Sequence, residues 1–386
     1  MNVADIMFAL FRYEFFKTEL SDEQRLAITT ERLPALFALS KRYDMAHLVA
    51  MALHENGLLN GKEDIHARFV RERQLAIMRY EQIRYEYEQI CELLEAEKME
   101  YIPLKGAVLR GYYPEPWMRT SCDIDVFVHE EELDKAAAKL VEKLGYTCEW
   151  KRSVNELSLH SPGGVHLELH YDLTEEGRFG KEILSDIWKY TERQEGSMRA
   201  SLTDPAFYYY HVVHMMKHFQ SGGCGVRPFL DLRVLESIPH DEEGRRALLE
   251  QGGALCFAEA AEKLSRVWFL GEEHDEMSKR MEEFLLQAGM YGDFENRKAV
   301  EKEKIGGKKN YLLSRIFLPN KLLKKKYPQV AKSPWKAPFY QIVRWWSLLF
   351  NKKVKDRTAK EIRAVSNKNK ARQKAVYQLM KDLEIC

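Results

Sequence analysis

Between residues 101 and 173, apolar residues recur in short runs typical of β-strands, and two stretches with helical spacing lie among them. In chain order the pattern predicts a strand Tyr101–Leu104, a helix Ala107–Tyr113, a strand Asp123–Val128, a helix Glu131–Leu144, and strands Tyr146–Arg152, Glu156–His160 and Val165–Leu173. Gly145 ends the second helix, and residues 161–164 form a turn between the last two strands. We therefore expect a small mixed sheet with helices.

Outside this stretch, apolar residues recur every three or four positions, as they do on one face of a helix. Helical segments are expected at residues 22–59, 65–99, 203–220, 227–235 and 254–270. The predicted fold class is therefore α+β, and four regions are expected. They are an N-terminal helical region 1–100, an α/β core 101–200, a helical domain 201–300 that closes the cleft, and a basic, aromatic-containing C-terminal tail 301–386.

The composition of the 386-residue chain, with 45% hydrophobic and 31% charged residues, is typical of a soluble protein with a sizeable core. No apolar run approaches the ~20 residues that a membrane helix needs, and the first residues lack the basic stretch of a signal peptide. The six cysteines are scattered and form no Cys-x-x-Cys pair, so reduced thiols and a cytoplasmic location are expected. Oligomeric state leaves no signal in the sequence.

The charge is distributed unevenly. Residues 302–386 hold 23 Lys and Arg against 5 Asp and Glu, a net charge of +18, whereas the preceding residues carry −17. This tail also contains Arg344, Trp345 and Trp346 among apolar residues. Tryptophan together with Lys and Arg suits an anionic polymer or a membrane surface, which would make the protein peripherally membrane-associated. A tail that docks on the acidic part of the chain is the alternative.

Two carboxylates, Asp123 and Asp125, lie two residues apart on a predicted strand, so their side chains share one face. Like charges placed together cost energy unless a cation lies between them, and carboxylate oxygens suit Mg²⁺. On the strand Val165–Leu173, His166, Glu168 and His170 also share a face. Taken alone, such residues are common on the exposed faces of strands.

Together, these features resemble the uncharacterised nucleotidyltransferase family, within the polymerase-β-like nucleotidyltransferase superfamily. The residues that carry the resemblance are Lys105-Gly106-Ala107, Arg119 and Asp123-Ile124-Asp125-Val126-Phe127-Val128. The resemblance is strongest from Leu104 to Leu173. It implies a polymerase-β-like core and a nucleoside triphosphate (NTP) as co-substrate. It also implies that Asp123 and Asp125 bind Mg²⁺ or Mn²⁺, and that a third carboxylate, for which Glu168 is the candidate, binds the metal or acts as a base.

The resemblance further assigns Lys105, Gly106, Arg119 and Ser121 to the phosphates of the NTP. A glycine after a strand lets the backbone approach a phosphate, and the N-terminus of the following helix favours anions. Ala107 stands where the wider superfamily has serine, and Ser121 could supply the missing hydroxyl. The alternatives are a plain turn with a solvated lysine, and a salt bridge from Arg119 that holds the aspartate loop.

A second set of polar residues lies in the helical region 201–300. His211, His214 and His218 share one face of the helix 203–220, with Lys217 beside them. Arg227 and Asp231 lie four residues apart on the next helix, and the resemblance extends to this region. With His170, the residues His214, Lys217, His218, Arg227 and Asp231 are candidates for the acceptor-substrate side of the cleft. Histidines that pack between helices with hydrogen bonds are the alternative.

Two hypotheses for function follow. The first is a Mg²⁺-dependent nucleotidyltransferase that moves a nucleoside monophosphate (NMP) from an NTP to a hydroxyl-type acceptor and releases pyrophosphate. The second is a catalytically inactive protein on the same fold that binds a nucleotide or a partner through its basic tail. The sequence does not select the NTP or the acceptor, since one fold supports many substrates.

Overall fold

The computed structural model describes residues 1–59, 64–150, 152–174, 179–193, 195–288, 294–305, 308–352, 356 and 370–385. The chain forms two compact units. The first consists of residues 1–217 and 225–282, and the second of residues 218–224 and 283–386. The candidate chemistry of the α/β stretch lies in the first unit.

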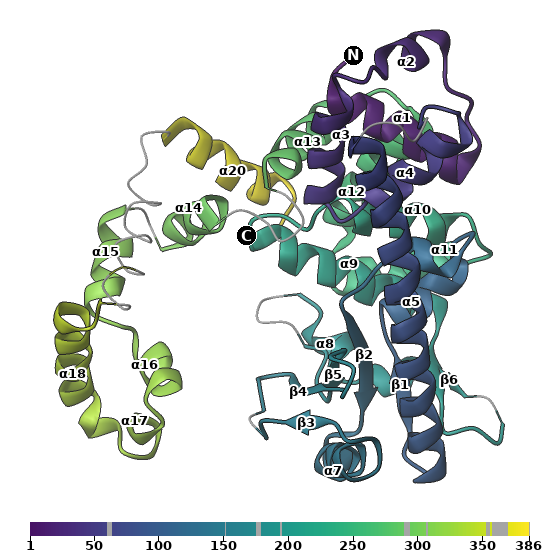
Figure 1. Cartoon of the computed structure of the whole chain (residues 1–386). Helices are drawn as coiled ribbons and strands as arrows, with labels where there is room; N and C mark the ends of the chain where they lie inside the picture. The colour runs from purple at the N-terminus through teal and green to yellow at the C-terminus, as the bar shows by residue number, and fades with distance from the viewer. Residues whose placement is uncertain are drawn as a thin grey trace. The chain divides into compact units, whose positions relative to one another are not determined.

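A five-stranded mixed sheet forms the centre of the α/β stretch (Figure 1). Its strands, in spatial order, are β1 (Tyr101–Pro103), β2 (Asp123–Val128), β5 (His166–His170), β4 (Glu156–His160) and β3 (Thr147–Cys148). β2 and β5 run parallel, and the other neighbouring pairs are antiparallel. A second, two-stranded sheet pairs β6 (Thr191–Arg193) with β7 (Ala200–Leu202). This mixed α+β architecture confirms the predicted fold class.

The two faces of the central sheet differ in chemistry because alternate residues of a strand point to opposite sides. The apolar residues of β2 and β5 are buried in one hydrophobic core with side chains of α5 (Asp64–Ala96) and α7 (Leu133–Leu144). Members of this set include Ile124, Val126, Leu167 and Leu169. The polar residues of the same strands, Asp125 and Glu168 among them, therefore belong to the other face. The packing of α5 and α7 thus leaves that face for chemistry.

Helices surround this sheet in the first unit. Before α5 come α1 (Val3–Phe16), α2 (Asp22–Ala27), α3 (Leu33–Arg42) and α4 (Ala46–Glu55). Between the strands lie α6 (Gly106–Leu109), the 3₁₀ turns η1 (Arg110–Tyr112), η2 (Pro116–Met118), η3 (Glu130–Glu132) and η4 (Ile187–Tyr190), and α8 (Lys181–Leu184). After them come α9 (Asp204–Gln220), α10 (Arg227–Glu236), α11 (Glu242–Gln251), α12 (Leu255–Leu270) and α13 (Glu276–Ala288).

Several predicted elements differ in length from the observed ones, and the helical segment expected at residues 22–59 is divided into α2, α3 and α4. The strand expected at Tyr146–Arg152 is only the two residues of β3, because Trp150 has φ 53° and turns the backbone out of the extended conformation. The strand expected at Val165–Leu173 is limited to β5. The helix expected at Ala107–Tyr113 is the single turn of α6 followed by η1. The strand Asp123–Val128 was predicted with its observed bounds.

The second unit is helical in the residues that the structure describes. Its helices are α14 (Phe294–Lys304), α15 (Lys308–Ile316), α16 (Asn320–Lys326), α17 (Pro328–Lys332), the turn η5 (Pro334–Lys336), α18 (Ala337–Phe350) and α20 (Lys370–Asp382). Over the described ranges of both units, no helix combines the length and the apolar character needed to cross a membrane.

Candidate active site

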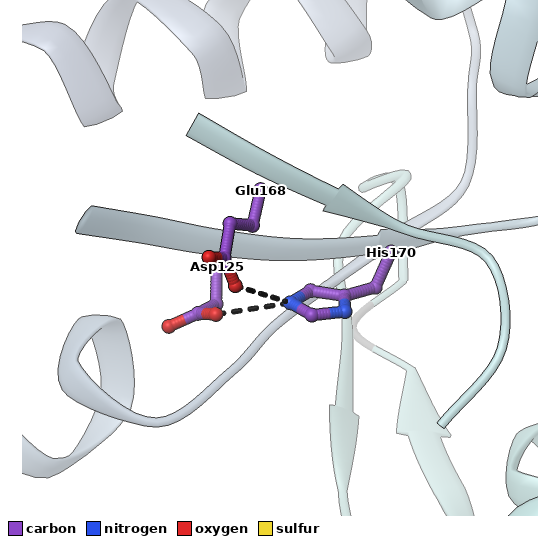
Figure 2. A group of neighbouring side chains, drawn as sticks. All are labelled: Asp125, Glu168 and His170. Carbon is purple, nitrogen blue, oxygen red and sulfur yellow. Dashed lines mark hydrogen bonds and ion pairs between the residues drawn. The ribbon is translucent and has the colours of Figure 1, made fainter. Parts of the chain in front are cut away.

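The candidate site is built on the two parallel strands β2 and β5. Their register places Asp125 directly beside Glu168, and both side chains lie on the face that α5 and α7 leave uncovered. Asp125 is buried, with 3% of its surface exposed, whereas Glu168 is partly exposed. Figure 2 shows the two carboxylates together with the imidazole of His170, which also comes from β5. The strand alternation that the sequence predicts thus brings a carboxylate from each strand to one point.

His170 links the two carboxylates (Figure 2). Its Nε2 lies 2.9 Å from Asp125 Oδ1 and 3.4 Å from Glu168 Oε2. Burial by itself would lower the pKa of His170, but the hydrogen bonds to Asp125 and Glu168 raise it above its ordinary value. A proton on Nε2 is therefore shared between two carboxylates, and the position of this proton is one that a metal cation can take.

Lys105 supplies a second positive charge to Asp125. Its Nζ lies 2.8 Å from Asp125 Oδ1. Burial would raise the pKa of the Asp125 carboxyl, but the charge of Lys105 and the hydrogen bond from His170 lower it below the ordinary range. Burial would likewise lower the pKa of Lys105, yet Tyr210 and Asp125 raise it. Asp125 is thus ionised and held between two donors.

The backbone of Lys105 is strained, with φ 41° and ψ −113°. This is a conformation that side chains disfavour, and it costs about 1–3 kcal/mol. The strained turn follows β1 directly and aims the Lys105 side chain at β2. Strain of this kind persists only where the surrounding structure fixes it, and it clusters at functional sites. The turn therefore marks Lys105 as more than a solvated lysine.

Asp123 lies two residues before Asp125 on β2, opposite His166 of β5. Burial raises the pKa of Asp123, and the negative charge of Asp125 adds to that effect. Among the described residues, the group whose ligand atoms all lie within 4.8 Å of one another consists of Asp125, Glu168 and His170, without Asp123. The structure therefore groups two of the three predicted metal ligands with a histidine that the sequence had suggested for substrate contact.

The donor set of this group fits a divalent cation. Two carboxylates offer the oxygen ligands that Mg²⁺ and Mn²⁺ prefer, and the imidazole nitrogen is a ligand that transition metals accept more readily than Mg²⁺. The negative charge of Asp123 next to the group raises the local demand for a cation. The ion itself is not identified by these residues.

Gly106, which follows Lys105, lies against two guanidinium groups. A Cβ at this position would be 3.0 Å from Arg119 Nη1 and 3.3 Å from Arg110 Nη2. Arg110 donates to the carbonyl oxygen of Gly106 at 2.7 Å and to Ser121 Oγ at 2.8 Å. Ser121 Oγ in turn donates to the carbonyl oxygen of Asp123. A side chain at this position would therefore crowd two cationic side chains.

Arg119 contacts Asp231 of α10. Arg119 Nε and Nη2 donate to the two carboxylate oxygens of Asp231 at 3.2 and 2.9 Å, and the hydroxyl of Tyr113 donates to Oδ1 at 2.7 Å. Burial opposes ionisation of Asp231, but Arg119 and the nearby His211 lower its pKa. The two candidates that the sequence assigned to different parts of the cleft thus meet in one buried ion pair.

The remaining candidates, His214, Lys217, His218 and Arg227, come from α9 and α10. Arg227 Nη2 lies 2.8 Å from Asp44 Oδ2. The ring of His214 lies 6.2 Å from that of Tyr210, and Lys217 and His218 are exposed. The contact of these residues with an acceptor stays a prediction.

His211 is buried, and its Nε2 lies 3.2 Å from the carbonyl oxygen of Pro228. Burial lowers the pKa of His211, although Asp231 and the carbonyl oxygen oppose this effect. This contact matches the packing alternative predicted for the histidine helix.

Two features of the site were outside the sequence prediction. Arg110 is 11 residues from Ser121, and only the folded turn shows that its guanidinium lies beside Gly106. Burial, together with the charge of Arg119, lowers the pKa of Arg110 to about 10. Tyr80 and Tyr87 lie on the helical segment predicted at residues 65–99, and both line a pocket with Asp123. The spacing of four residues between Gly106 and Arg110 could have predicted that Arg110 lies beside Gly106. The tyrosines, at helix positions where an aliphatic residue would be expected, could have predicted the pocket.

Comparison with known proteins gives one match. Residues 30–269 match the model of a family described as "Uncharacterised nucleotidyltransferase". Searches of curated proteins and of solved structures found no significant match. The small mixed sheet with its carboxylate group fits the polymerase-β-like core of such enzymes, for which an NTP is the substrate. Because the match covers more than half of the chain, the protein belongs to the uncharacterised nucleotidyltransferase family.

Proposed function

We propose that the protein transfers an NMP group from an NTP to a hydroxyl-type acceptor in a reaction that depends on Mg²⁺ or Mn²⁺. The acceptor oxygen forms a bond to the α-phosphorus, and the bond from that phosphorus to the oxygen that bridges it to the β-phosphorus breaks. Pyrophosphate leaves, and the acceptor's proton passes to a carboxylate. The single observation that carries the proposal is the register that sets Asp125 beside Glu168, with His170 on both.

Asp123, Asp125 and Glu168 would hold the metal, and His170 is a fourth candidate ligand. When bound, the metal neutralises charge on the triphosphate and on the leaving pyrophosphate. Asp125 is prepared for this role because it is ionised, buried and fixed by two donors. Glu168 is more exposed than Asp125, so it can also accept the proton of an acceptor hydroxyl.

Lys105 is the residue we assign to the triphosphate, since its ammonium already lies at Asp125 and its strained turn fixes it there. Ser121 and Gly106 position the neighbouring guanidinium of Arg110. For Arg119, two roles were predicted. The contact with Asp231 favours the salt bridge, in which Arg119 anchors the loop that leads into β2.

The test is isothermal titration of each NTP in Mg²⁺ and in Mn²⁺, followed by an assay for pyrophosphate release. The wild type should bind at least one NTP in a metal-dependent manner, and Asp123→Asn/Asp125→Asn should abolish this binding. Glu149→Gln is the matched control, because it removes an exposed carboxylate of the same α/β stretch. If the double substitution binds the NTP as tightly as the wild type does, then the carboxylates are not the metal site and the proposal fails.

The inactive alternative predicts a different result. It requires that the wild type binds the NTP and that neither the wild type nor the double variant releases pyrophosphate above background with any acceptor pool. The ion pairs of Asp125 favour the active enzyme, because a carboxylate kept charged in a buried position costs energy that a purely structural sheet does not require. The acceptor, the side of the cleft that holds it, and a cytoplasmic location remain parts of this proposal.

We also propose that the basic C-terminal region contacts an anionic membrane surface. The observation is the outward face of α18, where Phe339, Ile342, Val343, Trp346 and Phe350 are 37–73% exposed and follow helical spacing. Lysines surround this stretch in the sequence, and such a face with cationic flanks suits the lipid headgroup boundary.

Sedimentation with vesicles tests the membrane contact. The full chain should bind vesicles of phosphatidylcholine with phosphatidylglycerol and not vesicles of phosphatidylcholine alone, and Trp346→Ser/Phe350→Ser should weaken the binding. Equal binding by this variant and the wild type contradicts the assignment to α18. Binding to a nucleic acid polymer, with none to either vesicle, would replace the membrane by an anionic polymer.

A further inference from the structure

A pocket of about 270 Å³ opens between α5 and the segment that carries α6 and the start of β2. Side chains of α5 line the pocket on one side, and residues of α6, η1 and β2 complete the lining. The lining residues are Tyr80, Ile83, Arg84, Tyr87, Glu88, Ala107, Arg110, Asp123 and Ile124. All of them lie in the first unit, and one of them, Asp123, belongs to the candidate metal site.

The lining chemistry suits a flat aromatic ring. Two tyrosines and two isoleucines supply apolar walls, and Arg84 and Glu88 form an ion pair at 2.8 Å that offers donors and acceptors to a ring edge. Arg110 Cζ lies 5.8 Å from the centre of the Tyr80 ring, so a guanidinium plane and an aromatic face are present together. Bases stack on surfaces of both kinds.

Among the described residues, no carboxylate forms a close ion pair with Arg110, and the charge of Asp123 acts on it from a longer distance. Over the part of the chain that the structure describes, its guanidinium donates to the Gly106 carbonyl oxygen and to Ser121 Oγ, and it forms no ion pair. A partly buried cation of this kind at the wall of a pocket favours an electron-rich or anionic ligand. The pocket is also smaller than the roughly 300 Å³ at which whole ligand sites begin, so it fits one part of a larger ligand.

The position of the pocket identifies which part of the reaction it serves. In the sheet, β5 lies on one side of β2, whereas β1 and the α6 turn lie on the other. Glu168, the candidate base for the acceptor hydroxyl, comes from β5. In-line displacement requires the acceptor to approach the α-phosphorus from the side of its base. The pocket, at α6 and Asp123, lies on the side of β2 opposite to Glu168. This position is therefore the one available to the donor nucleotide.

We infer that this pocket binds the base of the NTP, with the ring between Tyr80 and Arg110 and the triphosphate extending past Asp123 toward Lys105. The inference rests on the proposed function, since it assigns the base site of the same donor. Ala107, which stands where the wider superfamily has serine, then lines the base site, and its small side chain leaves room for the ring.

The test compares ATP, GTP, CTP and UTP with inorganic tripolyphosphate, each titrated into the full chain in Mg²⁺. The wild type should bind its preferred NTP at least about tenfold more tightly than tripolyphosphate, because only the NTP carries a ring. Tyr80→Ala removes one wall and Ala107→Leu fills the pocket. Both should weaken NTP binding by roughly 10- to 100-fold and leave tripolyphosphate binding unchanged. Tyr85→Ala is the matched control, since Tyr85 lies on the same helix, is 61% exposed and is outside the pocket.

The outcomes separate this inference from the function on which it rests. If the wild type binds neither NTP nor tripolyphosphate, the proposed function fails, and the base site fails with it. If the wild type binds the NTP but both pocket variants bind it equally well, only the base site is wrong. Pocket variants that bind the NTP normally and lose turnover would show instead that the pocket holds the acceptor. Thermal unfolding of each variant confirms that it is folded.

Discussion

Asp125 and Asp231 are both buried carboxylates with a cation beside them, and they differ in how completely their surroundings balance their charge. Arg119 donates to both oxygens of Asp231, and Tyr113 adds a third donor. The result is a closed arrangement of one anion and one cation. A guanidinium matches a carboxylate in this two-point geometry, whereas an ammonium does not.

The arrangement at Asp125 is open by comparison. Lys105 and His170 both donate to the same oxygen, Oδ1, and two further carboxylates, Asp123 and Glu168, lie close by. Three carboxylates face one lysine and one histidine, so the negative charge is in excess. Burial of an acidic residue alone does not mark a functional site. An excess of carboxylates over cations at one point is the feature on which the candidate site rests here.

The largest effect expected is on catalysis. Asp125→Asn should lower the rate of pyrophosphate release by about 10³-fold or more, because the substitution removes the charge that holds the metal. The free energy of unfolding should fall by less than it does on Asp231→Asn, since Lys105 can still interact with Glu168. Steady-state kinetics and urea unfolding of both variants check this. If Asp125→Asn unfolds the protein and Asp231→Asn leaves it stable but inactive, the comparison is reversed.

The closed pair, Arg119 with Asp231, should instead affect the free energy of unfolding. Arg119→Met leaves Asp231 buried without its cation, so we expect a loss of about 3–5 kcal/mol in the free energy of unfolding. Replacing both partners by apolar residues, Arg119→Met with Asp231→Leu, should recover a large part of the loss. A double-mutant cycle by urea unfolding measures the coupling. A coupling near zero would mean that the pair is not the anchor of the loop before β2.

The same pair predicts a pH dependence. The pKa of Asp231 is lower in the folded protein than in the unfolded chain. Its contribution to stability is therefore present above the unfolded pKa of about 3.9 and is lost as the pH falls through the folded pKa. Arg119→Met should remove this contribution, and with it part of the loss of stability in acid.

Much of the open site could be predicted from local sequence, because it depends on strand alternation. Asp123 and Asp125 share a face by spacing alone, as do Glu168 and His170, and the bounds of β2 follow from its apolar run. The role of His170 as a link needs the register between β2 and β5, which depends on the whole sheet. The sequence therefore predicts which side chains share a face of the sheet, and not all of their contacts. The roles of these residues, and the four-region division of the chain, stay predictions.

The closed pair could not be predicted in the same way. Arg119 and Asp231 are 112 residues apart, and each has polar neighbours that could have been its partner. The short β3 was not predicted either, because the positive φ of 53° at Trp150 is one that residues other than glycine rarely adopt. Chemistry carried by one strand pair is local, whereas an ion pair between a loop and a distant helix is decided by tertiary packing.

A third buried carboxylate, Glu14 of α1, sharpens the comparison because its charge is not balanced. Glu14 is 1% exposed, and its Oε2 has no hydrogen-bond partner among the residues that the structure describes. Burial, together with the charge of Glu55, raises its pKa to about 7. Between its ordinary pKa near 4.5 and pH 7, the folded protein keeps a proton that the unfolded chain releases, so stability falls as the pH rises through this window.

Glu14→Gln should remove this dependence and stabilise the protein by about 2–3 kcal/mol at pH 8 relative to the wild type. Urea unfolding of both proteins at pH 5 and pH 8 measures it, and the gain should be much smaller at pH 5. Equal gains at the two pH values would show that Glu14 is ionised in the fold, and that a buried carboxylate here does not need a cation.

The smallest effect should come from Gly106, which separates the open site from the closed pair. A Cβ there would lie 3.0 Å from Arg119 Nη1 and 3.3 Å from Arg110 Nη2. Neither guanidinium can move freely, since Arg119 is held by Asp231 and Arg110 by Ser121. Against this crowding, alanine in the first turn of a helix is favoured over glycine by up to about 1 kcal/mol. We therefore expect Gly106→Ala to change the free energy of unfolding by less than about 1 kcal/mol.

Binding of NTP separates the two roles predicted for Gly106. If a phosphate approaches its backbone, the added methyl group obstructs that approach, and the Kd for the NTP should rise by up to about tenfold. Gly111→Ala is the control, because a Cβ at Gly111 meets no atom within 4 Å. An unchanged Kd in both variants, measured by titration in Mg²⁺, would make Gly106 a plain turn residue. The open site would then begin at Lys105, and the glycine would serve only to let Arg119 reach Asp231.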